Sequence, residues 1–449
     1  MRISFESFQK VFVSRFWKKL DESIVPYSTS IPNKSNFLKE LYEAISDYSY
    51  SPSRPREYIY IRKDRGAVRF VPTFEKRDYC TYFFCIKMLE EEIAVNRVPN
   101  TFGGWTLGNK IRLQEEAEGC ELDYAPPNSF DSTMWVKQWG SFQDVIKAAK
   151  NKIEWSYCVS FDIANFYDNI SLTALERKLR HAIPAKKHDV VNLLMQFLFN
   201  WNREIEGYGT KSVGLPQDEI GDCSRILANF YLQDYDLFMK GMAEKHGCLY
   251  TRYADDQIVF AKSQEAARRM VFEASMGLFR LNLSLNASKI REFNSVKAFE
   301  DYWCFDIFSQ LENPSVDDLN FVCKSYFDML GTGTPFRQAS VLKRLLKFDC
   351  KKLRRDLKHR LIAHLHEEPQ VVCCNQFYLG RFRDLIDHDQ EFFNFLDDFS
   401  NQCIFNSFHY NVKAYYKKNR VAHDLTPLRS LIAAIQKGRL KQMTFETSY

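Results

Sequence analysis

The sequence predicts an α+β protein whose C-terminal third is all-α. Two stretches in the middle of the chain, Ser156–Ile170 and Leu249–Ala261, alternate apolar and polar residues as β-strands do. Apolar residues at helical spacing surround these stretches, and strand signals fade beyond residue 311. With 449 residues the chain is too long for one ordinary domain and can bury a large core.

The composition is typical of a folded intracellular protein. Hydrophobic residues make up 45% of the chain and charged residues 27%. A net charge of +5 is too small to indicate nucleic-acid binding by itself, so local clusters must decide. The 12 cysteines include no CxxC pair, which favours reduced, buried thiols. No apolar run approaches the ~18 residues of a membrane span. We therefore expect a cytoplasmic protein without membrane contact.

The first third is expected to be helical and to contain one hairpin. Residues 1–55 predict short helices that end at a Pro-rich break. Glu57–Val71 predicts a hairpin turning at Lys63–Gly66, and Asp78–Asn96 a helix, whereas residues 121–140 are expected to be irregular. Cations near the hairpin could neutralise a nucleotide triphosphate, and a solvated basic hairpin is the alternative. These cations are Arg69, Lys76 and Arg77.

Two adjacent carboxylates, Asp255 and Asp256, lie at the turn within Leu249–Ala261. Adjacent like charges raise the cost of ionising each other, so we expect a cation beside them. A hard divalent ion such as Mg²⁺ accepts carboxylate oxygens. A solvated Asp-Asp turn is the alternative.

A third carboxylate, Asp162, is expected near the C-terminal end of a strand, on the face away from the core. The helix that follows is expected to begin after Ser171, which can cap it. Placed beside the Asp255 turn, Asp162 would complete a set of carboxylates able to hold two metal ions. Two such ions stabilise the attacking and leaving oxygens of an in-line phosphoryl displacement.

These stretches resemble the palm motifs of reverse transcriptases. FDIANFYDNI, residues 161–170, looks like motif A, and YADD, residues 253–256, looks like motif C. GLPQDEIGDCSRILANFYL, residues 214–232, is similar to motif B. The resemblance spans roughly residues 55–300 and implies a right-hand polymerase with fingers, palm and an all-α thumb/C-terminal domain. The expected parts are an N-terminal helical segment at 1–55, fingers at 56–152, palm at 153–310 and the helical thumb and C-terminal domain at 311–449.

The resemblance implies an RNA-directed DNA polymerase that copies an RNA template into DNA from dNTPs. Asp162, Asp255 and Asp256 would be catalytic and would hold two Mg²⁺ ions, with Mn²⁺ as a second candidate. Tyr167 would be the steric gate that excludes a ribose 2′-OH, and Gln217 would contact the nucleotide. Lys289 lies in a segment resembling motif D, where an ammonium could protonate departing pyrophosphate; a plain surface lysine is the alternative.

The C-terminal third predicts one long helix from Pro335 to Pro369. An apolar stripe runs along it, with a basic stripe beside it. Next to a polymerase palm such a stripe could follow a phosphate backbone, and a solvated face is the alternative. The members of this basic stripe are Lys343, Lys347, Lys351, Arg354 and Lys358.

Among reverse transcriptases, the chain is most similar to the bacterial abortive-infection and defence-associated enzymes. It lacks the NAxxH and VTG sequences of retron enzymes, and it has Ser224-Arg225 where other enzymes have Ser-Pro. Asp218-Glu219 follows Gln217 where most relatives have Gly, and these charges, beside the template–nucleotide channel, are expected to repel a generic nucleic-acid backbone. We therefore expect anti-phage defence with a dedicated non-coding RNA template or an unusual priming route.

Several alternatives stay open at this stage. The chain could be a retron-like or group II intron-like reverse transcriptase, a catalytically silent RNA-binding scaffold, or a toxin-like nuclease. Residues 218–219 could be a harmless insertion. The sequence also leaves open whether the chain forms a homo-oligomer.

Overall fold

The chain divides into two compact units. The computed structural model describes residues 3–25, 27, 30–63, 67–107, 111–116, 119–124, 134–149, 154–202, 212–218 and 222–419. The N-terminal unit comprises Met1–Tyr58 and Val71–Val296, and the C-terminal unit comprises Ile59–Phe70 and Lys297–Tyr449. The division after Val296 precedes the domain boundary expected at residue 310, and the outer part of the predicted hairpin groups with the C-terminal unit.

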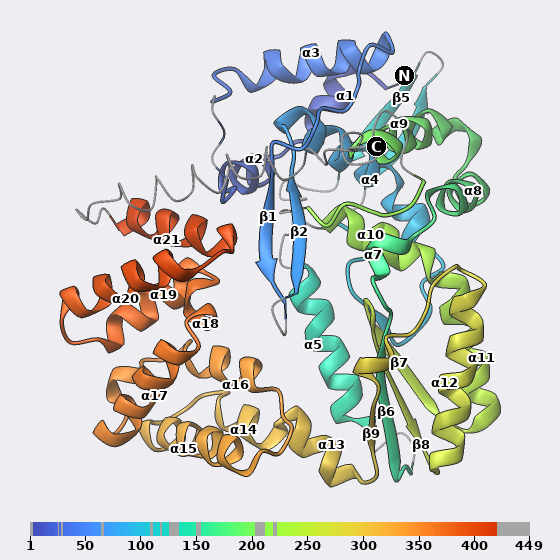
Figure 1. Cartoon of the computed structure of the whole chain (residues 1–449). Helices are drawn as coiled ribbons and strands as arrows, with labels where there is room; N and C mark the ends of the chain where they lie inside the picture. The colour runs from blue at the N-terminus through green and yellow to red at the C-terminus, as the bar shows by residue number, and fades with distance from the viewer. Residues whose placement is uncertain are drawn as a thin grey trace, which may run out of the picture. The chain divides into compact units, whose positions relative to one another are not determined.

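Short helices open the N-terminal unit, as predicted (Figure 1). Two of them are capped by side chains: Ser4 accepts a hydrogen bond from Ser7 N, and Asn33 accepts one from Asn36 N. Most side chains of the longer helix that follows the hairpin are buried, which gives the unit a core element. These helices are α1 (Phe5–Lys10), α2 (Ser14–Asp21), α3 (Lys34–Ser46) and α4 (Lys76–Ala94).

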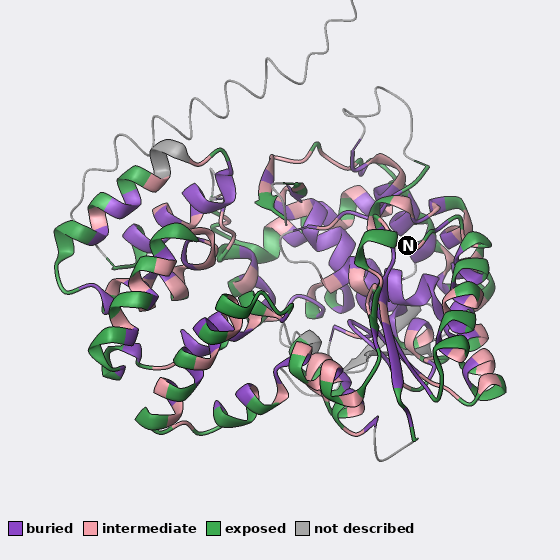
Figure 2. Ribbon diagram, turned by 60° about the horizontal axis from the view of Figure 1, so that its bottom comes forward, coloured by how far each residue is buried: buried purple, intermediate pink, exposed green. Residues whose placement is uncertain are grey.

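A five-stranded sheet of order β3-β7-β8-β6-β9 carries the predicted motifs. β3 pairs with β7 in parallel, and the other neighbours are antiparallel. Figure 2 shows that the central strands are largely buried. The strands are β3 (Thr101–Phe102), β6 (Tyr157–Asp162), β7 (Leu249–Tyr253), β8 (Asp256–Ala261) and β9 (Arg291–Phe293).

Helices cover this sheet. α12 (Gln264–Phe279) packs on β6 and β8 and against α11 (Gln233–His246), while α5 (Met134–Lys147) packs on β7 and β3 (Figure 1). Ser171 caps α8 by accepting a hydrogen bond from Ala174 N, as predicted. The remaining elements of this part are α7 (Phe166–Asn169), α8 (Leu172–Ala182), η2 (Ala185–Lys187), α9 (His188–Asn200) and α10 (Asp222–Tyr231).

The expectation that residues 121–140 are irregular was wrong over much of that range. β4 (Ile111–Glu116) and β5 (Gly119–Tyr124) form an antiparallel hairpin, and α5 begins at Met134. Both strands of the hairpin are rich in charged residues. Their alternation of apolar and polar residues is therefore weak, while backbone pairing still forms the ladder.

The C-terminal unit is helical from residue 297 to 419, in agreement with the predicted all-α third. The outer part of the hairpin formed by β1 (Glu57–Arg62) and β2 (Val68–Thr73) also belongs to it: Tyr60 N donates to Asn406 Oδ1 at 2.6 Å. The helices are α13 (Val296–Trp303), α14 (Phe305–Gln310), α15 (Val316–Thr332), α16 (Gln338–Leu345), η4 (Cys350–Lys352), α17 (Arg355–Glu367), α18 (Gln370–Cys373), α19 (Gln376–Leu385), α20 (Asp389–Gln402) and α21 (Asn406–Asn419).

The single long helix predicted from Pro335 to Pro369 was wrong. α16 ends at Leu345, η4 follows, and α17 begins at Arg355. The Asp349 side chain accepts a hydrogen bond from Lys351 N, and such local bonding competes with a continuous helix. The residues of the apolar stripe are nevertheless all buried, although some lie between the two helices: Leu342, Leu346, Cys350, Leu353, Leu357 and Leu361.

Two features bear on the surroundings of the protein. The cysteines that the structure describes are all free thiols, and most are buried. Within the described ranges, no helix has the length and apolar character needed to cross a membrane.

Candidate active site

The structure brings Asp162 next to the Asp255-Asp256 turn. β7 ends at Tyr253 and β8 starts at Asp256, so Ala254 and Asp255 form a tight turn. The register pairs Asp162 with Asp256 across β6 and β8. Asp162 is 5% exposed, so it is buried although it lies on the pleat opposite Phe161. Carboxylates from two neighbouring strands therefore meet at one end of the sheet.

The neighbouring carboxylates raise the cost of ionising Asp255. Burial, reinforced by the charges of Asp256 and Asp162, raises the pKa of Asp255 to about 7. Lys289 Nζ lies 2.9 Å from Asp162 Oδ2. Burial alone would lower the pKa of Lys289, but the hydrogen bond and charge of Asp162 outweigh it and raise that pKa.

A hard divalent cation fits this donor set, since it takes carboxylate oxygens and would relieve the repulsion that raises the Asp255 pKa. Among the described residues, no three acidic, histidine or cysteine side chains are already grouped as a metal site. Lys289 and Asn286 both contact Asp162 Oδ2, at 2.9 and 3.5 Å. A cation on that oxygen would compete with the ammonium for it.

Tyr167 and Gln217 come from two segments that lie side by side. Leu215 N donates to the carbonyl of Tyr167 at 2.8 Å. Both side chains are partly exposed. Each side chain is therefore accessible enough to contact a nucleotide.

Asp218, expected to repel a nucleic-acid backbone, is only 8% exposed, so little of its side chain reaches solvent. Its charge acts inward: it contributes to raising the pKa of the buried Tyr82 and Cys223, although burial is the larger cause. Glu219 lies outside the described residues.

The basic residues of the predicted fingers lie on two elements, β2 and α4. Lys76 and Arg77 form the first turn of α4. Lys76 Nζ lies 3.5 Å from Asp21 Oδ1. Lys76 and Arg77 line a cavity of about 480 Å³ beside α3. Arg69 is exposed on β2 and belongs to the C-terminal unit.

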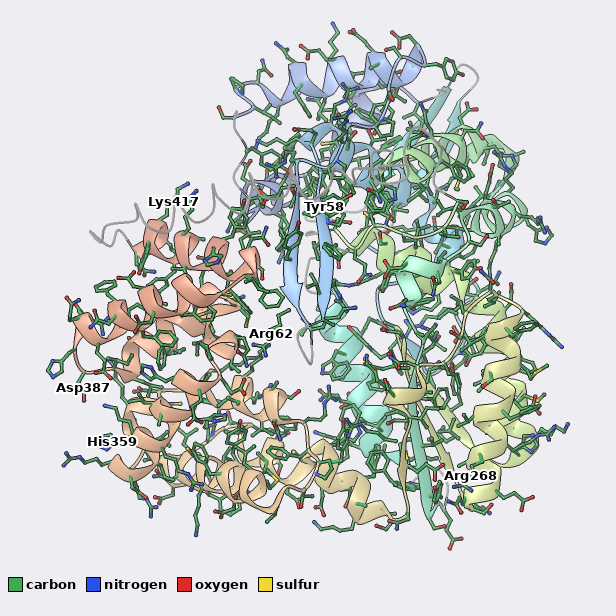
Figure 3. The ribbon with its side chains drawn as sticks, viewed as in Figure 1. Tyr58, Arg62, Arg268, His359, Asp387 and Lys417 are labelled. Atoms are coloured by element: carbon green, nitrogen blue, oxygen red, sulfur yellow. The ribbon has the colours of Figure 1, made fainter. Side chains whose placement is uncertain are left out.

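The basic stripe is distributed over α16, η4 and α17 and is partly paired with acids. Lys358 Nζ lies 2.9 Å from Asp387 Oδ1, which Figure 3 labels at the surface. Lys351 and Arg354 pair with Asp384 and Asp356 at 3.8 and 3.0 Å. Lys347 is exposed, and Lys343 is partly exposed.

A buried arginine at the carboxylate turn was missed by sequence reasoning. Arg252 is 0% exposed and binds Asp236, Asn229 and the carbonyl of Ala254. The available signal was a charged residue inside an apolar strand, which requires a buried partner.

Comparison with known proteins agrees with this site. Residues 118–331 match the model of the family described as "Reverse transcriptase (RNA-dependent DNA polymerase)". The matched segment contains Asp162, Asp255 and Asp256. Over this segment the chain is similar to a class of enzymes, the nucleotidyltransferases that polymerise DNA on RNA. More particularly, the matched segment is similar to the reverse transcriptase domain. Reverse transcriptases generally use divalent metal ions.

Solved structures similar to this chain include telomerases of two Candida species. Apo telomerase from Candida tropicalis truncated from its C-terminal domain shares 12% identity, with 60% of this chain and 59% of that chain covered and a TM-score of 0.36. Telomerase from Candida albicans in complex with a TWJ fragment of telomeric RNA shares 13% identity, with 92% and 69% covered and a TM-score of 0.34. The chain thus spans 59% of the length of the first of these structures. No curated protein sequence matches it.

Proposed function

We propose that the protein copies RNA into DNA by two-metal phosphoryl transfer. The observation that supports this most directly is the meeting of Asp162 with the Asp255-Asp256 turn, inside the reverse transcriptase domain. The carboxylates Asp162, Asp255 and Asp256 would hold two Mg²⁺ ions, with Mn²⁺ as a substitute. When bound, these ions would stabilise the charge that develops on the attacking and leaving oxygens.

The other residues would position the substrate and move protons. Tyr167 would stack beneath the sugar and leave no room for a 2′-OH, and Gln217 would contact the incoming dNTP. Lys289, released from Asp162, would donate its proton to the departing pyrophosphate. Arg69, Lys76 and Arg77 stay candidates for the triphosphate, and the basic stripe stays a candidate track for the nucleic-acid backbone.

Substituting the carboxylates tests this function. Asp255→Asn and Asp162→Asn each keep the shape of the side chain but remove one negative charge. Each should abolish Mg²⁺-dependent dNTP incorporation while the protein stays folded by circular dichroism. Asp234→Asn is a matched control, because Asp234 is an exposed acid of α11 that pairs with Lys178. Near-normal synthesis by Asp255→Asn would refute the assignment.

We further propose that the enzyme serves bacterial anti-phage defence in the cytoplasm, with a dedicated RNA or an unusual priming route. Ser224-Arg225 and the insertion after Gln217 support this through their likeness to defence-associated enzymes. Free, buried thiols fit a reducing compartment. The burial of Asp218 removes the repulsion argument, so this proposal depends on the resemblance alone.

A comparison of templates tests the second proposal. The purified protein would be assayed on poly(rA)/oligo(dT) and on RNA that copurifies from cells, with Asp255→Ala as the inactive control. We expect much faster synthesis on the copurified RNA. Equal, efficient synthesis on both would show that no dedicated template exists.

A further inference from the structure

The turn that carries Asp255 has a backbone conformation that needs outside support. Ala254 has φ 53°, in the left-handed region that residues with a Cβ rarely adopt. Both of its backbone polar groups are engaged. Its N–H donates to Phe102 O at 3.1 Å, and its carbonyl accepts from Arg252 Nη1 at 2.6 Å. The turn is therefore held from two sides, by β3 and by a side chain of β7.

Arg252 is itself fixed in place. Its Nε and Nη2 donate to the two carboxylate oxygens of Asp236 at 2.7 and 2.5 Å, and Nη1 also donates to Asn229 Oδ1 at 2.9 Å. Both charged side chains are fully buried. The planar guanidinium can make this two-pronged contact and still reach Ala254, whereas an ammonium lacks the fork.

Asn229 extends the network to the β3 side of the turn. Its Nδ2 donates to Gly104 O at 2.7 Å. Gly103 has φ 124°, and a Cβ there would lie 2.7 Å from Asn229 Nδ2 and 3.5 Å from Ala254 N. The backbone just after β3 therefore lies so close to the turn that only glycine fits at residue 103. One connected set of contacts joins α10, α11, β3 and β7 to Ala254.

We propose that Arg252 is a positioning residue, which with Asp236 and Asn229 sets the turn so that Asp255 and Asp256 can bind cations together with Asp162. The proposal rests on the proposed function of this turn as the metal site. The competing explanation is a purely structural ion pair inside the N-terminal unit. The two explanations differ in whether metal binding depends on Arg252.

The test replaces the ion pair without leaving a lone buried charge. The double variant Arg252→Met/Asp236→Leu removes both charges, and apolar replacement of a buried pair is often tolerated by the fold. Lys187→Met/Glu92→Gln is the matched control, because Lys187 and Glu92 form a mostly buried pair at 2.6 Å elsewhere in the same unit. Mn²⁺ binding is measured by electron paramagnetic resonance, and dNTP incorporation is measured against Mg²⁺ concentration.

The positioning role predicts Mn²⁺ binding ~10–100-fold weaker in the double variant, as for other residues that orient metal ligands, with a matching rise in the Mg²⁺ requirement. The control should bind Mn²⁺ as the unaltered protein does. Arg252→Lys keeps a cation beside Asp236 and is the variant to measure if the double variant does not fold. It should also weaken Mn²⁺ binding. Unaltered Mn²⁺ binding in whichever of these variants folds would overturn the proposal.

Failure of this proposal can be told apart from failure of the proposed function. If the unaltered protein incorporates no dNTP but its Mn²⁺ binding depends on Arg252, the polymerase function fails and the positioning role stands. If Asp255→Asn leaves Mn²⁺ binding unchanged, the turn is no metal site and the positioning role is overturned with it.

Discussion

Lys289 Nζ and Asp162 Oδ2 form an ion pair of 2.9 Å at the end of the central sheet. This lysine is 58% exposed, whereas the aspartate side chain is 6% exposed, so the ammonium reaches the carboxylate from the solvent side. Lys289 thus neutralises part of the charge of Asp162, and its proposed second role is to deliver a proton to the leaving group.

Lys289→Met separates these two roles. If the ammonium protonates pyrophosphate, kcat for dNTP incorporation should fall by about 100-fold, the lower end for general acid catalysis, and added Mg²⁺ should not restore it. Lys297→Met is the control, since Lys297 is an exposed lysine that pairs with Asp301 at 2.7 Å. Unchanged kcat with activation at lower Mg²⁺ would show that Lys289 only shields Asp162.

Stability of the metal-free protein should depend on pH through Asp255. Burial and the neighbouring carboxylates raise the pKa of Asp255 from 3.8 to about 7, so the folded protein holds a proton that the unfolded chain has lost. The free energy of unfolding in EDTA should therefore fall as pH rises from about 4 to about 7. Urea unfolding at a series of pH values checks this. Asp255→Asn should flatten the dependence, and an equally steep fall in that variant would place its origin elsewhere.

Tyr167 should govern the choice of sugar. Tyr167→Val opens the space that a 2′-OH needs and should lower the ratio of dNTP to rNTP incorporation efficiency. Tyr167→Phe keeps the ring and should keep that ratio. The measurement is kcat/KM for matched nucleotide pairs. An unchanged ratio in Tyr167→Val would remove the steric gate from this position.

The basic stripe should reveal phosphate contacts through salt dependence. A variant with Gln at Lys343, Lys347 and Lys351 should lower the log–log slope of RNA affinity against salt by about 0.7–0.9 for each charge that contacts phosphate. The control carries Gln at Lys240, Lys245 and Lys262, exposed lysines of the N-terminal unit. Equal slopes in the two triple variants would make the stripe a solvated face, which its ion pairs with Asp384, Asp356 and Asp387 also allow.

Alanine substitution of a glycine beside the turn should lower the incorporation rate, whereas the same substitution far from the turn should not. Gly103→Ala forces a Cβ against Asn229 at a positive φ, so it should lower the melting temperature and the incorporation rate together. Gly241→Ala adds a Cβ with nothing within 4 Å in the middle of α11, and it should leave the rate unchanged and raise stability slightly. Indistinguishable rates in the two variants would show that β3 need not approach the turn closely.

The parts of the fold that local sequence determines were predictable. The Ser171 cap, the β7–β8 turn and the apolar alternation of β6 depend on neighbouring residues, and each appears where its pattern indicates. The interruption of the helix around Asp349 could not be predicted, because the leucines on either side keep helical spacing across it. The charge-rich hairpin β4–β5 gave little alternation to detect.

The site residues likewise divide into those that local sequence predicts and those that depend on tertiary packing. Asp255 and Asp256 are adjacent in sequence, so their repulsion could be anticipated. The contacts of Arg252 with Asp236 and Asn229 bridge 16 and 23 residues and depend on how α10, α11 and β7 pack. The inward direction of Asp218 likewise follows from packing, and no short pattern encodes it.

The contacts of the hairpin β1–β2 limit when this part of the protein can fold during synthesis. The hydrogen bond from Tyr60 to Asn406 joins residues 346 positions apart within the C-terminal unit. At about 5–20 residues per second, a ribosome needs roughly 17–70 seconds to travel that distance. During this interval the hairpin has left the ribosome, but the helices that it contacts have not yet been synthesised. During synthesis the chain thus passes through a stage at which the Tyr60 backbone N–H still lacks its Asn406 acceptor.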